Sequence, residues 1–110
     1  MRFYRPFFLL RLVYPEALFR LRTRDKVLCL TFDDGPDPGC TPHILDILEA
    51  HRVKGVFFCN GQLAEKHPEL KSLIKSQGHV VGNHGYNHPD GWKTITSVYI
   101  RDFSKSAEFT

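Results

Sequence analysis

The sequence predicts an α/β protein whose strands and helices alternate in the order β-α-β-α-β-α. Three observations support this prediction. Short apolar runs rich in strand-forming residues recur at 26–32, 55–59 and 79–82. A segment with helical spacing of its apolar residues follows each run, and Gly, Pro or Asn separates the two kinds of segment. Such alternation is typical of parallel strands joined by right-handed helical crossovers.

The first strand is expected at 26–32, where an uninterrupted run of strand formers indicates burial on both faces. The helix that follows is expected to begin at Thr41, a good N-cap residue with proline directly after it, and to end near His51. Its predicted apolar face consists of Ile44, Leu45, Ile47 and Leu48.

The second strand is expected at 55–59 and the third at 79–82. Between them, residues 62–77 have helical spacing that is divided at Pro68, and Gly78 is expected to end the second helix. The residues predicted to point inward from that helix are Leu70, Leu73 and Ile74. A last helix is expected over 95–109, with helical spacing of Val98, Tyr99 and Phe103.

Composition and charge divide the chain into a basic N-terminal arm, residues 1–25, and an α/β domain, residues 26–110. The 110 residues allow one domain with a modest core, and 42% hydrophobic residues argue against disorder. Residues 1–26 carry seven Lys or Arg residues against two acidic ones, whereas the remainder holds eight basic and ten acidic residues. The body of the protein therefore offers no basic footprint for nucleic acid.

The basic arm matches neither a membrane span nor a secretory signal, because its longest apolar run, 7–10, ends at Arg11 and no small-residue cleavage site follows. Two interpretations remain open. The apolar residues of the arm cover the base of the fold, or the arm lies on an anionic membrane surface. A cytoplasmic and an envelope-associated location are both compatible with this pattern.

The three cysteines indicate neither a disulfide framework nor a metal site, because their number is odd and their spacing fits no zinc motif. Cys29 and Cys59 lie inside apolar runs and are expected to be small buried hydrophobic residues.

Two acidic residues and two histidines occur where predicted strands end. Asp33 and Asp34 close the first strand in LTFDDGP, and His84 and His88 follow the third in GNHGYNHP. Folds with parallel strands build their sites at the carboxyl edge of the sheet. Two imidazoles and one carboxylate supply three ligands for a divalent metal and leave positions for water. The other carboxylate is then free to act as a general base.

Each of these motifs also has a simpler explanation. Asp, Gly and Pro favour turns for local reasons, and paired histidines are often structural. Their joint placement after strands of one β/α pattern favours the metal site. Asn83 is a candidate to orient a ligand, or else a turn residue. The remaining histidines are expected to be structural; they are His43, His51, His67 and His79.

The segments TFDDGP and GNHGYNH resemble the first two motifs of the polysaccharide deacetylases, the carbohydrate esterase family that includes chitooligosaccharide and peptidoglycan deacetylases. The resemblance covers roughly residues 26–110. It implies an irregular (β/α) barrel, of which these residues form the N-terminal portion. The implied reaction is the metal-dependent removal of N- or O-acetyl groups from an acetylated polysaccharide or oligosaccharide.

The resemblance also implies a role for each site residue. Asp33 corresponds to the catalytic base, and Asp34, His84 and His88 correspond to the metal ligands. The implied cofactor is zinc, with cobalt or another transition metal as the alternative. Gly85 departs from the family pattern, which has Ser or Thr directly after the first histidine.

The chain also lacks the family's later motifs, among them the Leu-x-His that supplies the general acid. We therefore expect a truncated chain that is weakly active or inactive by itself. The alternatives are a non-catalytic remnant that binds metal or sugar, one half of a split enzyme that pairs with a separate C-terminal half, and a membrane-surface module. A phosphatase that forms an aspartyl phosphate is disfavoured, because the Asp-x-Asp-x-Thr pattern is absent.

Overall fold

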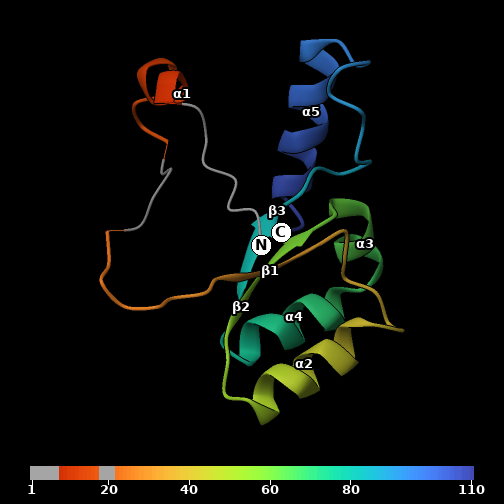
Figure 1. The fold of residues 1–110 in the computed structure, drawn as a ribbon. Helices are drawn as coiled ribbons and strands as arrows, with labels where there is room; N and C mark the ends of the chain where they lie inside the picture. The colour runs from red at the N-terminus through yellow and green to blue at the C-terminus, as the bar shows by residue number, and fades with distance from the viewer. Residues whose placement is uncertain (1–7, 18–21) are drawn as a thin grey trace.

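The computed structural model describes residues 8–17 and 22–110, and it has the predicted alternation of strands and helices (Figure 1). The elements are α1 (Phe8–Val13), β1 (Leu30–Asp33), α2 (Thr41–Ala50), β2 (Gly55–Cys59), α3 (Gly61–Lys66), α4 (Pro68–Ser76), β3 (Val80–Asn83) and α5 (Thr96–Ala107). The predicted division of the second helical segment at Pro68 is confirmed, because α3 ends at Lys66 and α4 begins at Pro68.

The three strands form one parallel sheet in the order β1-β2-β3. Asp33 is opposite Phe58, and Cys59 is opposite Asn83. All three strands therefore end at the same edge of the sheet, with β2 in the middle. This arrangement confirms an α/β class and is consistent with part of a barrel.

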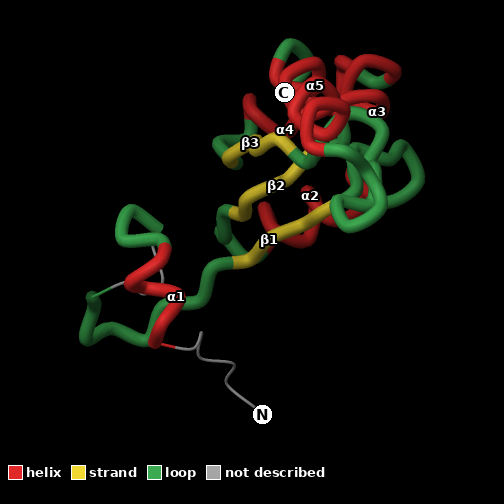
Figure 2. The backbone as a smooth tube through the Cα atoms, turned by 90° about the horizontal axis from the view of Figure 1, so that it is seen from above, coloured by secondary structure: helices red, strands yellow, loops and turns green. Residues whose placement is uncertain are grey.

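The helices α2 and α4 lie side by side against one face of the sheet (Figures 1 and 2). Their inward residues pack with alternate residues of β2, as expected for a strand whose side chains point to opposite faces. The buried apolar cluster consists of Leu45, Leu48, Phe57, Cys59, Ala64 and Ile74. Phe32 stacks on Phe57 with ring centroids 4.8 Å apart, which extends the cluster to β1.

The opposite face of the sheet is more open. Phe58 in the central strand is only partly buried, whereas its neighbours Phe57 and Cys59 are buried. Thr31 and Asp33 in β1 are exposed. Apolar burial therefore holds the sheet mainly from one side.

The first strand is shorter than predicted, and it is not buried on both faces. It begins at Leu30, which pairs with the first residue of β2, Gly55, so that residues 26–29 have no strand beside them. Leu28 is 80% exposed for this reason, and Cys29 is exposed as well. The expected burial of Cys29 is wrong, whereas that of Cys59 is confirmed.

Two details of the helices also differ from expectation. Thr41 is the first residue of α2 rather than its N-cap, and its Oγ1 accepts a hydrogen bond from Asp37 N at 2.9 Å. Ile47 and Leu73 were expected to point inward, but both are exposed. Each helix packs on a single sheet face, so only a narrow stripe of its surface is covered.

The structure shows α1 apart from the sheet and its covering helices (Figure 2). Leu12 and Val13 are 73% and 65% exposed, so the expectation that apolar residues of the arm cover the base of the fold is wrong for these residues. Residues 1–7 and 18–21 of the arm lie outside the described part of the chain. Within the described part, no helix has the length and apolar character needed to cross a membrane.

Candidate metal centre

The loop after β1 places Asp34 just beyond the edge of the sheet. Asp34 has a φ of +67°, an unusual conformation for a residue with a side chain and one that is often found at functional sites. The carbonyl of Gly35 accepts a hydrogen bond from Asn60 N at 2.7 Å. This bond ties the loop to the end of the neighbouring strand, β2.

The loop after β3 turns back toward the same point. His84 N donates to the carbonyl of Cys59 at 3.0 Å, and the carbonyl of Gly85 accepts from Gly61 N at 2.8 Å. Gly85 and His88 have positive φ angles of +79° and +56°. These left-handed residues bend the segment so that two imidazoles four positions apart lie on one side.

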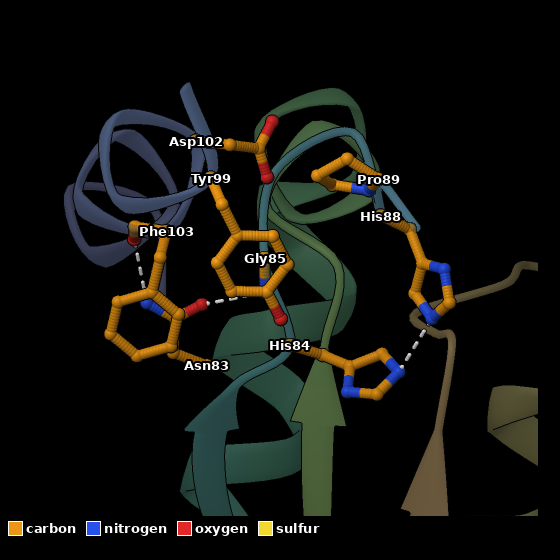
Figure 3. Close-up of a pocket in the computed structure, with 8 residues that line it drawn as sticks. All are labelled: Asn83, His84, Gly85, His88, Pro89, Tyr99, Asp102 and Phe103. Atoms are coloured by element: carbon orange, nitrogen blue, oxygen red, sulfur yellow. Dashed lines mark hydrogen bonds between the residues drawn. The ribbon is translucent and has the colours of Figure 1, made fainter. Parts of the chain in front are cut away.

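The predicted metal ligands converge across the end of β2. Asp34 Oδ1 lies 3.1 Å from His84 Nε2 and 3.3 Å from His88 Nε2, and the two nitrogens are 3.0 Å apart. Figure 3 shows the imidazole rings of His84 and His88 turned toward each other. β1 and β3 are separated by β2, a span of roughly 10 Å, so the side chains bridge the gap without closure of a barrel.

The geometry of these three atoms fits a divalent metal ion. Ligand atoms bound to one tetrahedral zinc ion are roughly 3.3–3.6 Å apart, within about 0.5 Å of the separations seen here. When both Nε2 atoms are unprotonated, their lone pairs and the carboxylate oxygen repel one another at these separations, and one cation attracts all three atoms. The set of two imidazoles and one carboxylate, with open positions, is the kind that binds a catalytic rather than a structural metal.

Asp33 is placed differently from Asp34. It is the last residue of β1, it is exposed, and it alternates onto the open face of the sheet with Thr31. It also lines a hollow that Asp34 borders. Its predicted role as a base stays a prediction.

Asn83 forms hydrogen bonds with both the histidine loop and α5. Its Oδ1 accepts a hydrogen bond from Gly85 N at 2.8 Å, and its Nδ2 donates to the carbonyl of Phe103 in α5 at 2.9 Å. These contacts favour the prediction that Asn83 orients a ligand, because they fix the backbone that follows His84.

Asp102 was not identified from the sequence, although it contacts the histidine loop directly. It lies on α5 and is only 9% exposed, and its carboxylate accepts hydrogen bonds from Tyr86 N and Asn87 N. One acidic residue within a helix carries no local signal of such a role. Only the structure shows that Asp102 and Ser106, one turn apart, are the buried residues of α5.

Of the histidines expected to be structural, His79 is the one that is buried. Its Nδ1 accepts a hydrogen bond from Gly55 N at 3.1 Å, which joins the start of β2 to the segment before β3. Burial, together with the nearby positive charge of Lys54, lowers the pKa of His79. A neutral imidazole therefore stabilises this corner of the sheet.

The chain is similar to known polysaccharide deacetylases. Residues 20–109 match the family described as polysaccharide deacetylase. The chain is 41% identical over 87 residues to the peptidoglycan-N-acetylmuramic acid deacetylase PdaA of Bacillus subtilis, a match that covers 79% of this chain and 33% of the relative. It is 48% identical over 84 residues to a chitooligosaccharide deacetylase of Rhizobium leguminosarum bv. trifolii, covering 76% and 39%.

Solved structures agree with the sequence matches. The structure of Bacillus subtilis PdaA, described as a family 4 carbohydrate esterase, superposes with a TM-score of 0.72 at 30% identity, covering 93% of this chain and 46% of that one. The chain spans between a third and two fifths of the length of the two curated relatives named above.

Proposed function

Because the chain belongs to the polysaccharide deacetylase family, a family of hydrolases, we propose that it contributes the metal site and the base of an enzyme that removes acetyl groups from an acetylated polysaccharide or oligosaccharide. The observation that carries this proposal is the convergence of Asp34 Oδ1, His84 Nε2 and His88 Nε2 within 3.0–3.3 Å. We propose zinc as the resident ion, with cobalt or another transition metal as the alternative.

We assign metal binding and proton transfer to different residues. Asp34, His84 and His88 hold the ion, which when bound would polarise the acetyl carbonyl and acidify a water molecule. Asp33, which is exposed and directly precedes the ligand Asp34 in the chain, accepts the proton from the attacking water. A carboxylate that does not bind the ion suits this task, because its lone pairs remain available.

We propose further that these residues are part of a larger barrel and have little activity alone. The three parallel strands form part of a (β/α) barrel, and one face of the sheet is open. The 110 residues lack the later family motif Leu-x-His, to which the family resemblance assigns the general acid. We therefore expect weak activity or none from these residues alone.

The test is to measure zinc uptake and acetate release separately. Equilibrium dialysis of the purified chain should give about one zinc ion per molecule, and Asp34→Ala should abolish most of this uptake. Asp33→Asn should leave uptake largely intact, because Asp33 is not a ligand. Equal loss in both variants would contradict the division of roles between the two aspartates.

Acetate release from acetylated chitooligosaccharides and from peptidoglycan fragments then measures catalysis. Release that is metal-dependent and reduced by Asp33→Asn would support a complete catalytic apparatus within these residues. Zinc uptake without release would favour the second candidate, a metal-binding chain that does not turn over substrate alone. The 73% exposure of the Asp34 side chain favours that candidate, because bulk water weakens the electrostatic interactions on which catalysis at an open site depends.

A further inference from the structure

The three residues between the two histidine ligands belong neither to a strand nor to a helix. Their backbone N–H groups therefore need other acceptors. Asn83 Oδ1 accepts a hydrogen bond from Gly85 N, and the Asp102 carboxylate accepts from the N–H groups of the next two residues. Tyr86 N donates to Asp102 Oδ2 at 2.7 Å, and Asn87 N donates to Asp102 Oδ1 at 3.0 Å.

The contact between Asp102 and the loop is extensive for a single side chain. The Asn87 amide adds a third bond, from Nδ2 to Asp102 Oδ1 at 2.7 Å. Burial acts to raise the pKa of Asp102, but hydrogen bonds from Asn87 and Tyr86 and the charge of Lys105 outweigh it and lower the pKa. The side chain is therefore ionised at neutral pH, and each of its bonds is charge-assisted.

Gly85 makes this approach possible. A Cβ atom at Gly85 would lie 3.3 Å from Asp102 Oδ2, closer than an ordinary contact, and the φ of +79° disfavours a side chain in any case. The family resemblance implies a hydroxyl residue at this position. In this chain, the absence of a side chain at Gly85 leaves room for the Asp102 carboxylate beside the loop.

We propose that Asp102 is a positioning residue that holds the segment between His84 and His88 in the conformation in which both Nε2 atoms face Asp34. The inference rests on the proposed function in one respect, which is that these three residues are the metal ligands. Asp102 acts on the backbone between the ligands and does not contact the ion.

Removal of this carboxylate would leave the N–H groups of Tyr86, which is buried, and of Asn87 without their acceptor, and the loop would adopt other conformations. The ion would then have to order the loop when it binds, so its affinity would fall. Loss of a partner that orients metal ligands typically lowers metal affinity by about 10–100-fold. A residue that only attached α5 to the sheet would change stability without changing the metal affinity of the folded protein.

The experiment compares Asp102→Asn with the matched control Asp46→Asn on the exposed side of α2. Titration with Co²⁺, followed by its visible absorption, should show an affinity about 10–100-fold lower for Asp102→Asn and an unchanged affinity for the control. The absorption bands of bound Co²⁺ should also shift, because the ligand geometry is less uniform. Equal affinity and identical bands in all three proteins would overturn the inference.

A milder variant keeps the test decisive if Asp102→Asn does not fold. Asn87→Ala removes one hydrogen bond to the carboxylate and leaves the charge in place. It should weaken Co²⁺ binding by about five-fold, the equivalent of one hydrogen bond. No change in affinity in this folded variant would also count against the inference.

Amide hydrogen exchange on the metal-free protein separates this inference from the proposed function. Tyr86 and Asn87 N–H should exchange faster in Asp102→Asn than in the wild type, whereas Phe57 and Phe58 in β2 should not. If the wild type binds no Co²⁺, the proposed function fails, and the exchange result alone decides whether Asp102 orders the loop. Unchanged exchange at Tyr86 and Asn87 would contradict that role.

Discussion

The covered face of the sheet and the inner side of α5 are held by opposite kinds of residue. On the covered face, α2 and α4 bury Leu45 and Ile74, which are 1% and 0% exposed. On α5 the buried residues are Asp102 and Ser106. The apolar residues of α5 are exposed, namely Val98, Tyr99, Ile100 and Phe103.

The difference shows that two kinds of force operate in one small protein. Apolar burial is non-directional and holds the sheet against α2 and α4. Hydrogen bonds are directional, and those that Asp102 and Asn83 accept from backbone N–H groups set the conformation of the loop that carries both histidines. The stability of the sheet and its covering helices should therefore depend on buried apolar volume. The metal affinity of the site should depend on individual polar groups.

Ile74→Ala should have the largest effect on stability. The side chain is fully buried between α4 and the sheet, so its truncation should lower the free energy of unfolding by about 2–5 kcal/mol. Urea unfolding measures this change. Ile47→Ala, at a position on α2 that is 60% exposed, should cost no more than about 0.5 kcal/mol. Similar losses in the two variants would contradict the assignment of the core.

His88→Ala tests the loop that α5 holds, where metal affinity depends on the placement of individual side chains. Loss of a ligand should lower zinc affinity by at least about 100-fold, close to 3 kcal/mol, with little change in the unfolding of the metal-free protein. Isothermal titration calorimetry measures the affinity. His43→Ala removes an exposed histidine from α2 and should bind zinc as the wild type does. A large loss in the control would indicate that zinc binds elsewhere.

Gly61→Ala tests the contact between α3 and α5. A Cβ at this position would lie 2.6 Å from Ser106 Oγ and 2.9 Å from Ser106 Cα, so the two helices would have to separate. We expect a loss of about 1–3 kcal/mol in thermal unfolding, as for other overpacked positions. Gly91→Ala is the matched control, because its Cβ would meet only the ring of Tyr99, at 3.4 Å. Equal stability of the two variants would show that α5 moves freely.

His79 should produce the smallest effect, a dependence of stability on pH. Its pKa in the folded protein is lowered from an ordinary value of 6.5. Above pH 6.5 the imidazole is neutral in both states, and as the pH falls below 6.5 the unfolded chain binds the proton first and stability is lost. Urea midpoints at pH 7.5 and pH 5.5 should therefore differ more for the wild type than for His79→Asn. An equal shift in the two proteins would exclude His79 as a source of the pH dependence.

Local sequence patterns predicted the elements of the α/β domain well. Strand-forming runs and capping residues indicated β2, β3 and the break at Pro68, because these signals act over a few neighbouring residues. They failed at residues 26–29, because burial of a strand requires a partner beside it and β2 begins only at Gly55. They also overestimated the inward face of α2 and α4 at Ile47 and Leu73.

The sequence by itself determined which chemical groups are available. Asp33, Asp34, His84 and His88 follow strands in one β/α pattern, and parallel strands end at a common edge, so a shared site was predictable. Only the tertiary structure decided that Asp34 reaches both imidazoles across the end of β2, and that Asp102 holds the loop between them. The physical reason is that strand periodicity and turn preferences are local, whereas a hydrogen bond between residues 86 and 102 depends on where α5 packs.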